Sequence, residues 1–271
     1  MSKALAVSHG DFGRAALYDL DRPITTHAHR EGHLIFRVGG AVPRVKIGGP
    51  TIVCGDGVAA AVSPWEPHSF EVRNGSCLSL VLYVKPMWFL ENTGSSEYAL
   101  NFGTKKLRLT AEIQGLVTRL TGLMINDVSD FAVEQLLIEL TSLCYALSWR
   151  DIQQPCASLT VLRVNDFRIR RSQKLMMNYL CDHEGLDLLA RAVGLSRPHF
   201  FKLFKKQTGV TPNVYFNTLR SERAIEDLVS TDKSVTDIAH DLGFASQASF
   251  SRFFSHNVGI APTDYKRVAR Q

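Results

Sequence analysis

Four histidines in the first quarter of the chain are the residues whose type and spacing most directly suggest chemistry. His27 and His29 are separated by one residue, so they point to the same face of the segment if it is a strand. His33 follows four residues later, and His68 lies across later turns, where a small β-barrel could bring it to the other three. Neutral imidazoles bind divalent metals and also hydrogen-bond polar ligands.

Three interpretations of this histidine cluster stay open. The histidines could line an effector pocket in the mouth of a barrel, with Arg37, Trp65 and Glu66 as neighbours. They could instead bind one divalent metal ion, which would be structural or would bridge to the effector. They could also be ordinary polar residues at strand ends.

A second pattern is a tandem repeat in the last third of the chain. A set of five residues recurs with an offset of 50, and Ala190 and Gly194 recur upstream with an offset of 49. Each copy predicts a short helix, a glycine-containing turn and a second helix, which is the outline of a helix-turn-helix unit. The five residues are Phe200, Phe204, Gly209, Pro212 and Tyr215, which recur as Phe250, Phe254, Gly259, Pro262 and Tyr265.

The second helix of such a unit enters the major groove of DNA, so its outward residues are candidates for contact with DNA. Arginine and lysine can donate to guanine, and glutamine can pair with adenine. Ser196 and Ser246 precede the two helices and are expected to cap them, and Arg223 between the units suits a phosphate. A plain helical bundle with solubilising lysines is the alternative. The candidates are Ser196, Arg197, Pro198, Phe201, Lys202, Lys205 and Lys206 in the first unit, and Gln247, Ala248, Ser249, Ser251 and Arg252 in the second.

The residues of the repeat resemble the DNA-binding domain of the AraC/XylS family of bacterial transcription regulators. The segments IAHDLGF, SFSRFF and G-x-x-P-x-x-Y, together with Arg220 and Ala224, stand where that family has them. Residues 24–85 are similar to the cupin fold. This resemblance implies a transcription regulator whose N-terminal barrel senses a small molecule, with RNA polymerase as a further partner. A metal-dependent cupin enzyme fused to a DNA-binding module is the alternative.

Regular elements must position these residues. Short β-rich runs separated by turns predict a small antiparallel barrel over residues 24–85, and three-to-four apolar spacing predicts helices over 107–125 and 131–149. The segment WFLENTGSSEY (88–98) is expected to be barrel packing and a loop. We call the second helix of each helix-turn-helix unit its reading helix. A helix over 212–230 is expected to separate the two reading helices by about 27 Å, close to one turn of DNA. The other C-terminal helices are predicted over residues 166–182, 186–193, 196–207, 234–241, 246–256 and 262–269.

The expected fold class is therefore α+β. Residues 1–150 are predicted to form a cupin-like effector-binding and dimerisation domain, residues 151–164 a linker, and residues 165–271 an all-α DNA-binding domain with two helix-turn-helix units. The helices over 107–125 and 131–149 are expected to mediate homodimerisation, although packing on their own barrel explains their apolar faces equally well. The candidate interface residues are Leu116, Leu120, Leu136, Leu140 and Leu143.

Composition and charge limit the possible functions further. The net charge is +5, and it arises after residue 164, where 16 Lys and Arg face 11 Asp and Glu, whereas the earlier residues hold 15 of each. A polyanionic partner for the C-terminal region is therefore expected. Five widely spaced cysteines, no long apolar run and no secretory signal predict a cytoplasmic protein with no membrane partner. Phosphate-binding loops and catalytic serine or cysteine motifs are absent from the sequence, so we expect no enzyme and no certain cofactor.

Overall fold

The computed structural model describes residues 2–93, 100–126, 131–152, 166–178 and 185–269. Within these ranges the N-terminal half holds two antiparallel sheets, a six-stranded sheet in the order β1-β2-β9-β4-β7-β10 and a four-stranded sheet in the order β3-β8-β5-β6. The strands are β1 (Lys3–Gly10), β2 (Gly13–Leu20), β3 (Ile24–His27), β4 (Gly32–Gly40), β5 (Arg44–Ile47), β6 (Thr51–Val53), β7 (Val58–Val62), β8 (His68–Glu71), β9 (Cys77–Val84) and β10 (Lys106–Arg108).

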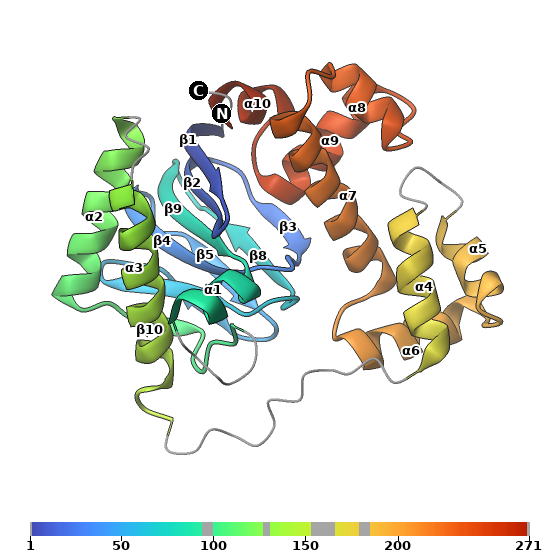
Figure 1. The fold of residues 1–271 in the computed structure, drawn as a ribbon, viewed down its shortest axis with the longest axis horizontal. Coiled ribbons are helices and arrows are strands. Elements are labelled where there is room, and N and C mark those ends of the chain that lie inside the picture. The colour runs from blue at the N-terminus through green and yellow to red at the C-terminus, as the bar shows by residue number, and fades with distance from the viewer. Residues whose placement is uncertain (1, 94–99, 127–130, 153–165, 179–184, 270–271) are drawn as a thin grey trace.

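The inner strands of the six-stranded sheet are buried on both faces. Its inner face packs on the four-stranded sheet, where Tyr18 and Val81 meet Val45 and Phe70. Its outer face is covered by α1 (Pro86–Thr93), α2 (Ala111–Ile125) and α3 (Phe131–Trp149), which lie together beside the sheet (Figure 1). Strands buried on both faces read as continuous apolar runs, which explains the sequence of β9, CLSLVLYV.

Four of the leucines predicted for the dimer interface belong to this core instead. Leu116 and Leu120 on α2, and Leu136 and Leu140 on α3, are at most 4% exposed and pack against the barrel of their own chain. Leu143 is half-buried in the same cluster. The expectation is therefore wrong for these four leucines, because the outer face of the six-stranded sheet already covers their side chains, whereas the half-buried Leu143 stays a candidate interface residue.

Other sequence expectations for this half hold, with some corrections. The short antiparallel strands expected over residues 24–85 are present, and α3 has the expected bounds. The sequence reasoning missed β1, β2 and most of β3, and it extended α2 over residues 107–110, where β10 and the capping residue Thr110 lie. The first residues of WFLENTGSSEY belong to α1, and residues 94–98 lie outside the described residues.

The C-terminal half is helical throughout its described residues. The expected linker falls almost entirely outside them, as does the end of the helix expected over 166–182. The helices are α4 (Phe167–Asn178), α5 (Gly185–Ala192), α6 (Arg197–Thr208), α7 (Pro212–Ser230), α8 (Val235–Asp241), α9 (Gln247–Val258) and α10 (Pro262–Ala269). The α+β fold class is thereby confirmed.

The two halves pack directly on each other. Leu20 and Ile24 of the barrel share one apolar cluster with Phe254 and Val258 of the second helix-turn-helix unit. The first unit has a separate core around Phe200 and Phe204. Among the described residues no helix combines the length and apolar character needed to cross a bilayer.

Candidate functional site

The first reading helix, α6, presents a basic outer face. Phe200 and Phe204 are fully buried beneath it, which leaves the opposite side of the helix towards solvent. Ser196 occupies the N-cap position, but its side chain makes no capping hydrogen bond, so the expected cap is absent there. Phe201 is half-buried, and the other predicted residues are exposed, namely Ser196, Arg197, Pro198, Lys202, Lys205 and Lys206.

The second reading helix, α9, has the same construction with fewer charges. The backbone amide of Ser249 donates to Ser246 Oγ at 3.2 Å, so the cap expected here is present. Gln247, Ala248 and Arg252 are exposed, whereas Ser249 and Ser251 are half-buried. Thr236 Oγ1 of α8 donates to Gln247 Oε1 at 2.8 Å and orients this side chain.

Helix α7 holds the two reading helices apart. It runs between them, with α6 near one end and α9 near the other (Figure 1). Its 19 residues span about 28 Å. Arg220 on α7 donates from Nη2 to Leu242 O at 2.6 Å, and its guanidinium lies 3.9 Å from the ring centre of Phe244, so it ties α7 to the turn of the second unit. Arg223, a predicted phosphate contact, pairs with Asp227 at 3.2 Å.

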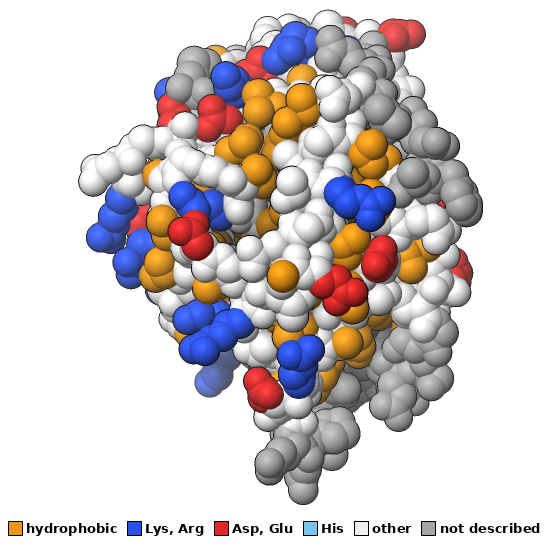
Figure 2. Space-filling view, turned by 90° about the vertical axis from the view of Figure 1, so that its left-hand side faces the viewer, with side chains coloured by type: hydrophobic (Ala, Val, Ile, Leu, Met, Phe, Trp, Pro, Cys, Tyr) orange, Lys and Arg blue, Asp and Glu red, His pale blue; other side chains and the backbone are white. Residues whose placement is uncertain are grey.

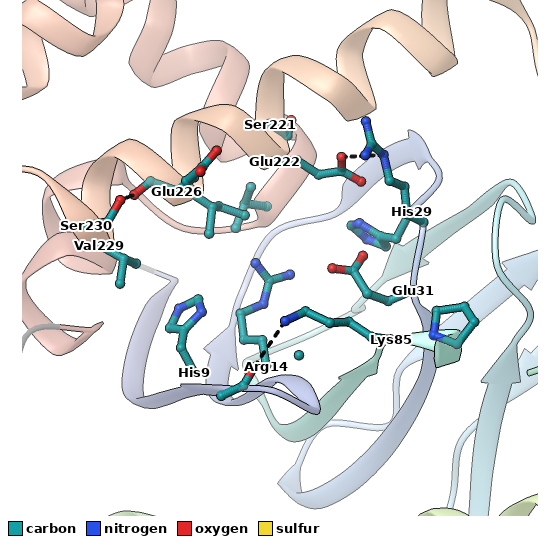
Figure 3. A pocket seen from close by; sticks show the side chains of 16 residues that line it. His9, Arg14, His29, Glu31, Lys85, Ser221, Glu222, Glu226, Val229 and Ser230 are labelled. Atoms are coloured by element: carbon teal, nitrogen blue, oxygen red, sulfur yellow. Dashed lines mark hydrogen bonds and ion pairs between the residues drawn. The ribbon is translucent and has the colours of Figure 1, made fainter. Parts of the chain in front are cut away.

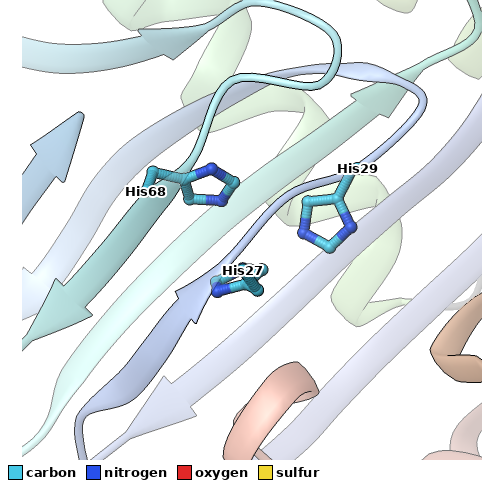
Figure 4. A group of neighbouring side chains, drawn as sticks. All are labelled: His27, His29 and His68. Carbon is cyan, nitrogen blue, oxygen red and sulfur yellow. The ribbon is translucent and has the colours of Figure 1, made fainter. Parts of the chain in front are cut away.

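The structure brings the four histidines together between the two sheets. His27 is paired with His68 across β3 and β8, and His33 with Tyr83 across β4 and β9. The ring centres of His27 and His68 are 4.3 Å apart, as are those of His33 and His68. One ring nitrogen from each of His27, His29 and His68 lies within 4.8 Å of the others (Figure 4).

The hydrogen bonds of the cluster leave ring nitrogens with free lone pairs. Nδ1–H of His27 donates to Thr25 O at 2.6 Å, and Nδ1–H of His68 donates to Glu66 O at 2.8 Å. Within the described part of the chain, His29 Nε2, His33 Nδ1 and His68 Nε2 are buried without a hydrogen-bond partner. Burial lowers the pKa of His27 to about 4 and the pKa of His29, His33 and His68 well below the usual range, so all four are neutral at pH 7.

This donor set fits a transition metal. Neutral imidazoles held through the opposite nitrogen by a backbone carbonyl are the usual arrangement for metal-binding histidines. Nitrogen ligands suit zinc and similar ions rather than calcium or magnesium. A tetrahedral zinc site needs ligand nitrogens about 3.3 Å apart, so the distances between the three nitrogens, which are at most 4.8 Å now, would have to shorten by up to about 1.5 Å.

The three other residues predicted beside the histidines have different surroundings. Arg37 lies four residues further along β4 and donates to Asp56 at 2.5 Å and to Gly40 O. Trp65 stacks on Tyr215 of α7, with ring centres 4.5 Å apart and an angle of 9° between the planes. Glu66 pairs with Lys105 at 2.6 Å. Each of the three side chains is thus engaged by a neighbour outside the cluster.

A cavity of about 560 Å³ lies between the barrel and α7, next to the histidine cluster (Figure 3). His29 borders both. The charged residues that line the cavity come from both halves of the chain, with Arg14, Glu31 and Lys85 from the barrel side and Glu222 and Glu226 from α7. Sequence reasoning missed these residues because they come from segments about 200 positions apart.

Arg14 is the central cation of this cavity. Its side chain is nearly buried, its Nη1 donates to Tyr265 OH at 3.2 Å, and its guanidinium lies 3.7 Å from the ring centre of Tyr83. Its Nε has no hydrogen-bond partner, and among the described residues no carboxylate forms an ion pair with it. Glu222, opposite, pairs with Arg30 at 2.9 Å, yet burial raises its pKa to about 7.

Comparisons with known proteins agree with this geometry. Residues 189–268 match the family model described as a helix-turn-helix domain. An uncharacterised HTH-type transcriptional regulator of Staphylococcus aureus is 41% identical over 98 residues, which are 33% of this chain and 13% of the relative, so the chain spans only a small part of that protein. The probable transcriptional regulator LumQ of Photobacterium leiognathi is 23% identical over 93% of this chain and 95% of its own.

Among solved structures, apo ToxT of Vibrio cholerae has a similar fold over 96% of this chain and 98% of its own, with a TM-score of 0.62 and 11% identity. ToxT has also been solved bound to an unsaturated fatty acid. The C-terminal part of the chain thus matches a helix-turn-helix domain, within an α+β fold that resembles that of ToxT over nearly its full length.

Proposed function

We propose that this protein is a sequence-specific DNA-binding transcription regulator that reads two successive major grooves with α6 and α9. The main support for the proposal is the position of the two reading helices. Each ends at a glycine, and α7 holds them near its opposite ends. Their exposed Lys202 and Arg252 can reach base edges. Exposed lysines such as Lys205 and Lys206 suit phosphates, which position a protein on DNA without reading sequence.

Control of DNA binding by a small-molecule effector is the second part of the proposal. Ligand cavities of roughly 300–1,000 Å³ occur preferentially between domains, and the cavity of about 560 Å³ lies between the barrel and the helix that positions both reading helices. The buried Arg14, without a carboxylate partner among the described residues, favours an effector with an acidic group. An effector in this cavity touches both halves, so it shifts DNA affinity by its preference for one arrangement of them.

Association into a homodimer and action on RNA polymerase complete the proposed function. The face formed by α2 and α3 shows apolar side chains interspersed with charges (Figure 2). Ile125 on α2 is 58% exposed, and Leu123 and Ile138 are half-buried there. These residues replace the buried leucines as candidates for contact with a second copy.

DNA binding is tested by fluorescence anisotropy with a duplex from the regulator's own promoter and a scrambled duplex of equal length. At 150 mM salt we expect the promoter duplex to bind at least about 10³-fold more tightly. Equal affinity for the two duplexes would remove sequence-specific regulation. Lys202→Ala should weaken promoter binding, whereas Lys105→Ala, in the barrel, serves as the matched control and should not.

The effector site is tested separately by thermal shift against a set of small carboxylic acids. We expect one or more acids to raise Tm in the wild-type chain and in Arg37→Gln, the control at a residue that does not line the cavity. The shift should be lost in Arg14→Gln. An acid that stabilises Arg14→Gln as strongly as the wild-type chain would place the effector elsewhere.

A further inference from the structure

The short segment from His27 to His33 does two things at once. It supplies three of the four clustered histidines, and the residues between them contact α7. Thr218 Oγ1 of α7 donates to Ala28 O at 2.9 Å, and Arg30 Nε pairs with Glu222 Oε2 at 2.9 Å. The position of this segment therefore sets how α7 rests on the barrel.

A second set of contacts, through Trp65, connects the cluster to α7. The backbone amide of Trp65 donates to His29 O at 2.7 Å, and the Trp65 ring stacks on Tyr215 near the start of α7. Trp65 adopts a positive φ of 61°, a conformation that a tryptophan holds only where its surroundings require it. Trp65 thus holds the backbone of His29 and also contacts α7.

The cluster itself is incomplete as a hydrogen-bonded core. Buried polar atoms in folded proteins nearly always have a partner, because a buried atom without one costs free energy. Here three buried ring nitrogens, those of His29, His33 and His68 named above, have none among the residues that the structure describes. A metal ion would satisfy such lone pairs together, whereas a bound proton is disfavoured by the same burial.

We propose that His27, His29 and His68 bind one divalent transition-metal ion, of the zinc type, and that this ion fixes the His27–His33 segment beneath α7. Metal occupancy then alters the affinity of the reading helices for DNA. His33 lies beside this site with its ring 4.3 Å from that of His68 and is available as a further nitrogen donor. The regulatory half of this inference rests on the proposed function, whereas the metal site does not.

The metal site is tested on the full chain, stripped with a chelator and then dialysed against zinc or cobalt(II). Elemental analysis should find about one ion per chain, and cobalt should give the visible absorption of a nitrogen-coordinated ion. His68→Gln and His29→Gln should each retain less than a tenth of the ion. His240→Gln, an exposed histidine on α8, is the matched control and should bind like the wild-type chain.

Two results would overturn the metal site. One is a folded wild-type chain that takes up no stoichiometric zinc or cobalt. The other is stoichiometric binding that survives in both cluster variants. Circular dichroism establishes that each variant is folded, and His29→Gln covers the case in which His68→Gln is not, because His29 is only half-buried.

The coupling is tested by measuring Kd for the promoter duplex with zinc and with chelator. Allosteric couplings commonly change affinity about 5- to 150-fold, so the wild-type chain should show a change of at least about fivefold. Thr218→Val removes the hydrogen bond to Ala28 O, so it should keep one ion per chain but reduce the change to less than twofold.

The outcomes separate the two claims. Specific DNA binding with one ion per chain but the same Kd in zinc and in chelator overturns the coupling alone. A chain that binds zinc but no specific duplex leaves the metal site standing, and it contradicts the proposed function and with it the coupling. Equal responses of the wild-type chain and Thr218→Val would show that the Ala28 contact does not transmit the effect.

Discussion

At the scale of single residues, Glu222 shows how the barrel and α7 influence each other's charge. Its carboxylate pairs with Arg30, but its position between the two halves also removes it from water and brings it near Glu31. Burial is the larger influence and raises the pKa of Glu222 to about 7. The interface therefore contains a carboxyl group that changes charge close to neutral pH.

This predicts a stability that falls as the pH rises. The unfolded chain gives up the Glu222 proton near pH 4.3, below the folded-state pKa, so the stabilisation is full below about pH 4 and is lost towards pH 7. Between pH 5 and pH 8 the free energy of unfolding should drop by about 2 kcal/mol more in the wild-type chain than in Glu222→Gln. Urea unfolding at both pH values measures this difference. Glu226→Gln, an exposed neighbour one turn away, should follow the wild-type chain, and parallel behaviour of Glu222→Gln would contradict the argument.

Arg252 is the residue expected to read a base from the second helix. It is exposed on α9, and a bidentate contact to guanine contributes about 1–3 kcal/mol of discrimination. Arg252→Ala should therefore weaken binding to the promoter duplex about 10- to 100-fold while leaving binding to a scrambled duplex nearly unchanged. Competition binding with single-base variants measures this. A uniform loss on all duplexes would instead identify Arg252 as a phosphate contact.

The residues of the candidate sites were predictable only where sequence neighbours stay neighbours in the fold. The His27 and His29 pair follows from strand alternation, and its approach to His68 follows from pairing in a small barrel. Arg14, Tyr83 and Glu222 gave no comparable signal. They meet because a strand, its neighbour in the sheet and a distant helix converge, and no local spacing encodes that convergence.

At the scale of elements, the two helix-turn-helix units differ in what surrounds them. Gly194, in the turn of the first unit, and Gly259, at the end of α9, both have positive φ angles, +71° and +92°. A side chain at Gly194 would meet no atom within 4 Å, whereas one at Gly259 would come within 2.7 Å of Ile24 of the barrel. The end of α9 in the second unit is therefore packed on the barrel, whereas the turn of the first unit has free space around Gly194.

This difference predicts unequal effects of the same substitution. Gly194→Ala and Gly259→Ala both place an alanine in the left-handed region, at about 1–2 kcal/mol. Gly259→Ala should lose further stability, because Ile24 and Leu20 must move. Thermal unfolding of the two variants measures the difference in Tm. Equal losses would mean that the second unit does not rest on the barrel as the structure shows.

The helices were more predictable than the strands. Periodic apolar faces, prolines and terminal glycines marked α3 and the helices of both units, most of them to within a residue or two. Strands β1 and β2 lack such signals: β2, GRAALYDL, is buried on both faces and so shows no alternation. The leucines of α2 and α3 show the other limit, since an apolar face does not reveal whether its own barrel or a second chain covers it.

At the scale of the whole molecule, the barrel and the DNA-binding region behave as parts of one packed body. The apolar cluster around Leu20 and Ile24 continues into Phe254 and Val258, and α7 rests on the segment that carries the clustered histidines. Boundaries placed from sequence suggested two units joined by a linker. The sequence boundaries could not show this contact, because neither surface has a distinctive local sequence pattern. The two surfaces come together only in the folded chain.

In the proposed complex, one chain places α6 and α9 in successive major grooves on the same face of a duplex. Hydroxyl-radical footprinting with methylation interference, performed on a specific promoter fragment, tests it most directly. We predict two protected patches on one face with centres about 10.5 base pairs apart, and loss of the patch assigned to α9 in Arg252→Ala. A single protected groove, or two patches on opposite faces of the duplex, would show that α6 and α9 do not occupy successive grooves.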